Sequence, residues 1–234
     1  MKKYVLAAAC VVILSPLSAR AEWTGSGELG LVFARGNSDT ETVNAAIELI
    51  YSKDRWINQT NVSYLRSENE NELNASRFLA SNETNYSLNE RSYILGAARY
   101  DRDRFSSFDY QASFALGYGY KIIDSETHKL TGEIGPGVRH SELRESGDSE
   151  TELIGRASLD YAWQISETAS LSNLFLVESG SSNTFLENAL SLEVAINSAM
   201  SLKTGVSVRH NTDVEAGRDK TDYLSTVNLV YSFD

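Results

Sequence analysis

The sequence predicts an all-β fold: a transmembrane antiparallel β-barrel of about twelve strands in an up-and-down meander. The clearest evidence is the segment 108–122, where every second residue is apolar, from Phe108 through Leu116 to Ile122. The residues between them, such as Gln111, are polar or small. Successive side chains of a strand point to opposite faces. Strands of soluble sandwiches usually have about 5–6 residues, so an alternation this long is typical of a strand that crosses a bilayer.

A second observation is the low hydrophobic content of the chain, 41%. Beyond residue 21, no apolar run approaches the ~20 residues that a spanning helix needs. Only alternate residues of a barrel strand face lipid, so a barrel can cross a membrane with such a composition. The formal net charge of −11 and the absence of a basic cluster argue against nucleic acid as a partner.

Residues 1–21 have the pattern of a secretory signal peptide. Lys2 and Lys3 precede an apolar run over 4–14, and Ala19-Arg20-Ala21 fits a small-residue cleavage site. We expect cleavage after Ala21, which leaves 22–234 as a single barrel domain. The only cysteine, Cys10, is removed with the signal peptide, so the mature chain has no disulfide and no thiolate ligand. An exported chain without cysteine fits the envelope of a Gram-negative bacterium.

Twelve segments repeat the alternation. The expected strands cover residues 25–35, 40–52, 55–66, 74–88, 91–101, 108–122, 129–141, 152–165, 169–179, 184–196, 200–210 and 221–233. Connections after even-numbered strands are short, whereas those after odd-numbered strands include the acidic stretches 67–73, 143–151 and 211–220. Short periplasmic turns and longer outer loops are the rule for such barrels. Pro136 lacks an N–H for the strand ladder, so we expect a β-bulge there.

Aromatic residues on the apolar face gather at the strand ends. Near the short turns they are Tyr51, Trp56, Tyr86, Tyr118, Tyr120, Tyr161, Trp163, Tyr231 and Phe233; at the far ends they are Phe33, Tyr64, Phe78, Tyr100, Phe108, Tyr110 and Tyr223. Amphipathic rings favour the two membrane interfaces. Two girdles of this kind indicate a membrane barrel more than a soluble periplasmic β protein, which is the alternative.

The opposite face carries charges of both signs. The residues expected to line the lumen are Glu48, Arg77, Glu83, Arg99, Asp109, Lys121, Glu133, Arg139, Arg156, Asp160, Glu187, Glu193, Lys203, Arg209 and Asp222. Charge inside a barrel must be paired or hydrated. About eight strands give a bore that side chains fill and 16–18 leave an open channel. Twelve strands therefore leave two interpretations: a network that fills the bore, or a narrow aqueous channel for small solutes.

Catalytic, cofactor-binding and metal sites are not predicted. His140 and Ser141 are adjacent, as are His210 and Asn211, so alternation places the members of each pair on opposite faces. A nucleophile and its base must share hydrogen-bonding reach. The acidic loops lack the spacing of a calcium loop. We therefore expect a protein that is not an enzyme; an outer-membrane lipid hydrolase or acyl-transfer enzyme is the alternative.

The first hairpin, GELGLVFARGNSDTETVNAAIEL with its turn at Gly36-Asn37-Ser38-Asp39-Thr40, resembles the start of the salt-induced outer membrane protein family. The resemblance implies an outer-membrane barrel of unknown function with a link to salt or osmotic stress. The family has no established catalytic residues, so the resemblance assigns none to this chain. The last strand, ending Tyr231-Ser232-Phe233, looks like the signal read by the outer-membrane assembly machinery, although Asp234 follows the aromatic residue.

Together these observations predict an integral outer-membrane barrel with a structural or small-solute channel role. The expected partners are outer-membrane lipid, lipopolysaccharide and the assembly machinery, and the expected state is a monomer.

Overall fold

The computed structural model describes residues 22–34, 40–70, 72–215 and 217–233. The predicted signal peptide, the turn at 36–39 and Asp234 lie outside these residues. All regular elements in the described part are strands: β1 (Glu22–Ala34), β2 (Thr40–Lys53), β3 (Trp56–Asn69), β4 (Glu72–Ser87), β5 (Ser92–Asp103), β6 (Phe108–Asp124), β7 (His128–Leu143), β8 (Ser149–Gln164), β9 (Ala169–Ser179), β10 (Thr184–Ala195), β11 (Met200–Asn211) and β12 (Thr221–Phe233).

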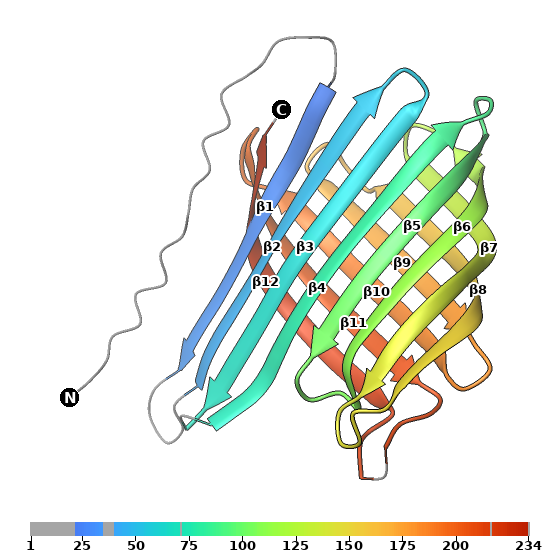
Figure 1. Ribbon diagram of the computed structural model, residues 1–234. Coiled ribbons are helices and arrows are strands. Elements are labelled where there is room, and N and C mark those ends of the chain that lie inside the picture. Colours follow the sequence, from blue (N-terminus) through green and yellow to red (C-terminus); the bar gives the residue numbers. More distant parts are fainter. Residues whose placement is uncertain (1–21, 35–39, 71, 216, 234) are drawn as a thin grey trace.

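Each strand pairs antiparallel with its neighbour in sequence, and β12 pairs with β1 to close the barrel (Figure 1). The closing seam is in register from Gly25 opposite Phe233 to Leu29 opposite Leu229. The predicted fold, a closed antiparallel meander of twelve strands, is confirmed. Closure pairs the strand edges, so the backbone groups of every strand face another strand. Within the described residues, no helix is long and apolar enough to cross a membrane.

Two details of the predicted strand pattern are wrong. The acidic stretch 67–73 is not a loop, because β3 extends to Asn69 and β4 begins at Glu72. Similarly, only residues 144–148 of the stretch 143–151 connect β7 to β8. Charged residues do not interrupt a strand that has left the membrane, since the backbone hydrogen bonds there do not depend on apolar side chains. The strands therefore continue past the aromatic girdle.

The β-bulge expected at Pro136 is also absent. On β6 and β7 the paired residues on either side of it are Ala115 with Gly137 and Tyr118 with Ile134, so the same number of residues lies between them on both strands. A Cβ at Gly135 would collide with the Leu116 carbonyl, which shows how closely the two backbones approach here. The glycines beside Pro136 let β6 and β7 stay together without an extra residue. The register shifts in β6 lie near its ends, at 108–110 and 121–123.

The exterior of the barrel is apolar, the reverse of a soluble domain. Leu116, Ile134 and Leu153 are 58%, 67% and 84% exposed. Rings pair at both ends of this belt, for example Trp56 with Tyr86 near the short turns and Phe78 with Tyr100 near the longer connections. A belt of exposed aliphatic residues between aromatic rings is the surface that a bilayer covers.

Four polar side chains interrupt this belt on β3 and β4, and they satisfy one another. The Asn58 amide donates to Asn82 Oδ1 at 3.2 Å and to Thr84 Oγ1 at 2.6 Å, and the Asn82 amide donates to Asn58 Oδ1 at 3.1 Å and to Thr60 Oγ1 at 2.8 Å. Both threonine hydroxyls donate back to the asparagine oxygens. Because no donor is left over, the cluster can face hydrocarbon without the penalty of an unpaired polar group.

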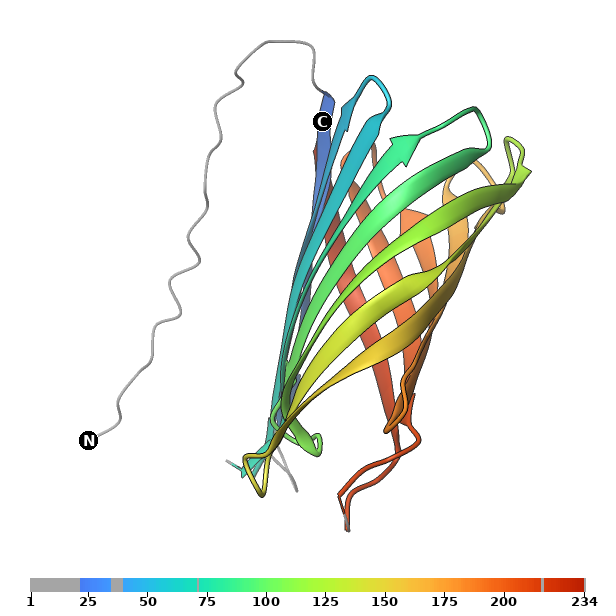
Figure 2. The same cartoon turned by 45° about the vertical axis from the view of Figure 1, so that its right-hand side comes forward.

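The barrel has two unlike ends. The short turns, the start of β1 and the end of β12 lie at one end, and the longer connections lie at the other (Figure 1). The wall narrows toward the end with the longer connections (Figure 2). We call these the turn end and the loop end.

Candidate functional site: the bore of the barrel

The turn-end half of the bore contains a water-accessible space, which we call the inner chamber. Its main cavity has a volume of about 410 Å³. Eight charged side chains line this cavity: Glu48, Glu83, Arg99, Glu133, Arg156, Asp160, Glu178 and Glu187. Carboxylates exceed guanidinium groups in this wall, so the cavity has an acidic interior.

Hydrogen bonds orient most of these carboxylates. Glu133 accepts from Arg156 at 2.8 Å, from the Ser158 hydroxyl at 2.8 Å and from the Tyr93 hydroxyl at 2.7 Å. The Asp160 carboxylate makes no hydrogen bond or ion pair with the described residues. It is also exposed to the chamber, and is therefore available to solvent or solute.

The inner chamber continues to the turn end. A neighbouring cavity of about 350 Å³ shares Asp160 and Glu187 with the first. Another, of about 310 Å³, shares Glu48 with the main cavity and is also lined by Glu193 and by residues of the seam strands β1 and β12. In this part Lys203 Nζ lies 2.6 Å from Glu28. Polar space therefore extends along the bore from the turn end to the level of Glu187.

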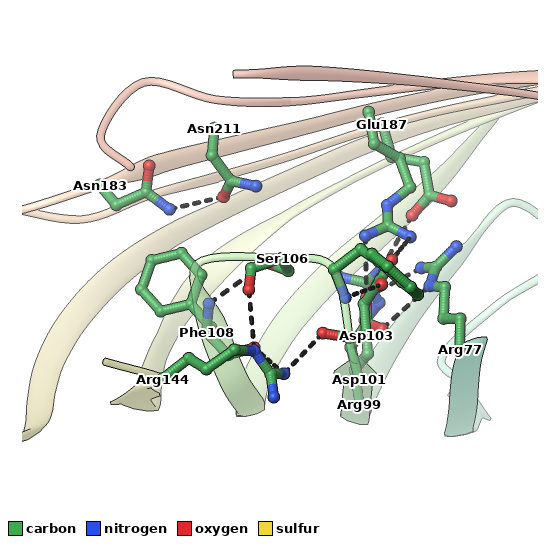
Figure 3. Close-up of polar contacts among 12 residues, drawn as sticks. Arg77, Arg99, Asp101, Asp103, Ser106, Phe108, Arg144, Asn183, Glu187 and Asn211 are labelled. Carbon is green, nitrogen blue, oxygen red and sulfur yellow. Dashed lines mark hydrogen bonds and ion pairs between the residues drawn. The ribbon is translucent and has the colours of Figure 1, made fainter. Parts of the chain in front are cut away.

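Between the inner chamber and the loop end, a cluster of charged residues crosses the bore. We call it the arginine layer: Arg77, Arg99, Asp101, Asp103, Glu187 and Arg209. Arg77 donates two hydrogen bonds to the Asp101 carboxylate, from Nε at 2.9 Å and from Nη2 at 2.8 Å. Arg99 donates to Glu187 at 2.9 Å and to Asp101 at 3.2 Å (Figure 3). Its guanidinium also lies 4.4 Å from the centre of the Phe185 ring.

These contacts join opposite walls. Asp101 and Arg99 lie on β5, Glu187 on β10 and Arg209 on β11, and in the closed order of strands β5 is far from both β10 and β11. The Arg209 guanidinium lies 3.7 Å from Asp101 and 3.7 Å from Asp103. Ion pairs that span the lumen narrow its cross-section, so the arginine layer forms a constriction between the inner chamber and the loop end.

A buried ion pair stands in the wall beside this layer. Arg139 is 2% exposed; it donates to Glu152 at 2.6 Å and to the backbone carbonyls of Glu178 and Asn183. Asn183 in turn donates to Asn211 Oδ1 at 2.7 Å (Figure 3). Arg139 thereby ties β7 and β8 to the β9–β10 connection.

Connections also meet over the loop end. The Glu215 N–H donates to Ser107 Oγ at 3.0 Å, Arg218 donates to the Phe105 carbonyl at 3.3 Å, and the Glu145 N–H donates to Glu215 at 3.2 Å. The β11–β12 connection therefore reaches over the mouth to the β5–β6 and β7–β8 connections.

Thirteen of the fifteen residues expected in the lumen line the inner chamber, belong to the arginine layer, stand beside it, or line a cavity of about 210 Å³ between the layer and the loop end. The two that do not are Asp109 and Lys121. Asp109 pairs with Arg144 at 3.0 Å and with Arg102 at 3.5 Å at the rim, because the register of β6 shifts beside it. Lys121 lies near the turn end, 45% exposed and 3.6 Å from Asp124.

Several important residues were not among those expected. Asp101 binds the arginines of the layer, Glu152 pairs with Arg139, and Glu28 pairs with Lys203. Alternation already places Asp101 on the same face as Arg99, so the signal was present. Their partners lie on other strands, and alternation within one strand does not reveal them.

The three histidines contact hydroxyl groups on neighbouring strands. His128 lies 2.8 Å from the Tyr161 hydroxyl, His140 2.8 Å from Thr151 Oγ1, and His210 2.8 Å from Thr221 Oγ1. Ser141 instead contacts Gln111 inside the barrel. In the described part of the chain, no group of three or more His, Cys, Asp and Glu residues is placed to hold a metal ion.

The fold and its charged bore define the class of protein: a transmembrane β-barrel of the outer-membrane type. Solved structures of this class share the fold. The NanC porin aligns with a TM-score of 0.54 at 10% identity, covering 91% of this chain and 100% of that one. An outer membrane channel from Pseudomonas putida F1 aligns with a TM-score of 0.53 at 12% identity, covering 93% and 97%.

Within this class the chain belongs to the family DUF481, described as a protein of unknown function, which matches residues 27–233. The family membership that the first hairpin indicated, in a group of barrels of unknown function, is thus confirmed. A relative, the uncharacterized protein YdiY of Escherichia coli (strain K12), is 27% identical over 227 residues, which is 94% of this chain and 87% of that protein.

Proposed function

We propose that this protein is a narrow channel of the Gram-negative outer membrane that passes small solutes and prefers cations. The observation that carries the proposal is the inner chamber, a space lined by an excess of carboxylates. A bore lined by one sign of charge within low-dielectric walls concentrates ions of the opposite sign. The porin and the channel with the same fold support the general role.

The arginine layer sets the size limit of this channel. The Arg99–Glu187 ion pair crosses the lumen at hydrogen-bonding distance, so passage requires side chains of the layer to move apart. We therefore expect small conductance steps with long closed periods, in contrast to the steady current of an open 16- to 18-stranded porin.

Purified protein refolded into a planar bilayer tests this function. Under a KCl gradient, the reversal potential should report a preference for K⁺ over Cl⁻, and Glu83→Gln combined with Asp160→Asn should reduce it. Discrete steps with no ion preference would contradict the cation assignment. A complete absence of steps, in wild type and in variants of the arginine layer alike, would favour a purely structural wall.

Localisation and partners complete the proposal. The chain is exported by its signal peptide, cleaved after Ala21, and inserted by the outer-membrane assembly machinery, which reads β12. It stays monomeric among outer-membrane lipid and lipopolysaccharide. N-terminal sequencing of the mature protein and fractionation of the envelope test the first part. Growth of a deletion strain at raised osmolarity tests the link to salt stress that the resemblance implies.

We also propose that the protein is not an enzyme. The competing hypothesis, an outer-membrane lipid hydrolase, predicts release of fatty acid from phospholipid or lipopolysaccharide. Such an activity, if it disappeared in His140→Ala or His210→Ala, would replace the channel as the principal function.

A further inference from the structure

Between the arginine layer and the loop end lies a cavity that the channel proposal does not use. This outer cavity has a volume of about 210 Å³. Its wall combines two guanidinium groups, Arg77 and Arg209, with two carboxylates, Asp103 and Asp222. Leu65, Phe105 and Leu224 supply apolar surface.

Arg209 is the unusual member of this wall. Its side chain is 8% exposed, and its Nε–H has no hydrogen-bond partner among the described residues. The carboxylates that neutralise it, on Asp101 and Asp103, stand 3.7 Å away. This distance exceeds that of a hydrogen bond. A buried guanidinium that donates no short hydrogen bond retains its capacity to bind a carboxylate, which it prefers in a forked geometry.

Asp222 supplies a carboxylate whose hydrogen-bond acceptors are unused in the described part of the chain. It lies directly opposite Arg209 across the β11–β12 ladder, yet its carboxylate makes no hydrogen bond or ion pair with the described residues. The cavity thus holds one cation and one anion with unused hydrogen-bonding capacity, side by side on adjacent strands.

We propose that the outer cavity is a binding site for a small zwitterion of the α-amino acid type. The ligand carboxylate accepts hydrogen bonds from Arg209, and its ammonium group donates to Asp222 and Asp103. The balance of two cations and two anions in the wall selects the class of ligand. A purely anionic or purely cationic ligand would leave one wall charge opposed by a like charge, whereas a zwitterion compensates both. An aliphatic side chain contacts Leu65 and Leu224.

Binding is measured by isothermal titration calorimetry of the full-length mature barrel in detergent micelles. The probe is L-leucine, and its matched analogues are 4-methylpentanoate, which lacks the ammonium group, and 3-methylbutylamine, which lacks the carboxylate. Leucine should bind at least about ten-fold more tightly than either analogue, because each analogue loses the charge-assisted hydrogen bonds at one side of the site.

Two variants and a control assign the site. Arg209→Gln and Asp222→Asn should each weaken leucine binding at least about ten-fold. Asp222 is exposed and unpaired, so Asp222→Asn remains informative if Arg209→Gln fails to fold. The control is Asp160→Asn in the inner chamber, which should bind leucine like wild type.

The inference is overturned if wild type gives no heat with leucine at concentrations up to the limit of its solubility. Equal binding of leucine and 4-methylpentanoate, or an unchanged affinity in Asp222→Asn, also overturns it. Because the titration needs no conduction, a barrel that binds leucine but passes no current would refute the channel and leave this site intact. A barrel that conducts ions but does not bind leucine would refute this site and leave the channel proposal intact.

Discussion

The inner chamber and the arginine layer are built from the same strands by the same alternation, yet one is open and the other is closed. In the chamber, carboxylates outnumber guanidinium groups, and Asp160 has no partner among the described residues. In the layer, three arginines meet three carboxylates, and the pairs reach across the lumen from β5 to β10 and β11.

The balance of charge, more than its amount, distinguishes the two regions: six carboxylates share two guanidinium groups in the main cavity, whereas three arginines match three carboxylates in the layer. Unpaired like charges repel and hold water between them, whereas opposite charges on facing walls attract and exclude it. Four experiments test this contrast.

The largest effect is expected for Asp101→Ala. This change leaves Arg77, Arg99 and Arg209 without their shared carboxylate, and loss of one partner from a buried ion-pair network costs about 3–5 kcal/mol. Urea unfolding in phospholipid vesicles measures the loss. In planar bilayers the same variant should conduct more and shift its preference toward Cl⁻. A wild-type reversal potential would contradict the assignment of the layer as the constriction.

A charge added to the exterior of the barrel should lower the unfolding free energy by less than Asp101→Ala does. Leu190 faces outward on β10 and is 43% exposed, so Leu190→Arg should lower the unfolding free energy by about 2–4 kcal/mol if this position lies near the bilayer midplane. The matched control is Ser191→Arg on the next residue, which faces the inner chamber. Equal losses for the two would mean that the exterior does not face lipid.

The cross-bore pair itself is measured by a double-mutant cycle on Arg99→Ala and Glu187→Ala. The two side chains are 14% and 13% exposed, so a coupling energy of about 1–3 kcal/mol is expected. Arg156 and Glu83 in the chamber are 14% and 26% exposed and lie 3.4 Å apart; they provide the comparison and should couple more weakly, because the contact is longer and Glu83 is more exposed to solvent. The reverse order would show that the chamber, and not the layer, holds the walls together.

The smallest effect on stability is expected for Asp160→Asn. This carboxylate has no partner to lose among the residues that the structure describes, so the unfolding free energy should change by no more than about 0.5 kcal/mol. Its removal takes a negative charge from the chamber and should reduce the K⁺ preference measurably. A large loss of stability would reveal a structural role for Asp160.

Much of the fold could be predicted because alternation is a local property. The ends of β9 and β12 agree with the predicted ranges 169–179 and 221–233. The strand ends predicted near 67–73 are wrong. The acidic residues there predict a loop, but the backbone hydrogen bonds of β3 and β4 continue through most of this stretch. At Pro136 the missing N–H predicts a β-bulge, whereas the adjacent glycines keep β6 and β7 in register.

The candidate site was harder to predict because its contacts are not local. Asp109 shows the limit most clearly: one register shift in β6 is enough to place it at the rim with Arg144. Asp101 on β5 and Arg209 on β11 are separated by five strands in sequence, and each strand alone gives only the face on which they lie.

The pattern of residues along the chain is enough to show that alternate side chains meet two different surroundings, that twelve strands repeat this pattern, and that long and short connections lie at opposite ends. These properties follow from neighbours along the chain. Which charges meet becomes visible in the folded barrel, because closure of β1 on β12 brings β5 to face β10 and β11 across the lumen. Ion pairing acts over a few ångströms in space, whatever the separation in sequence.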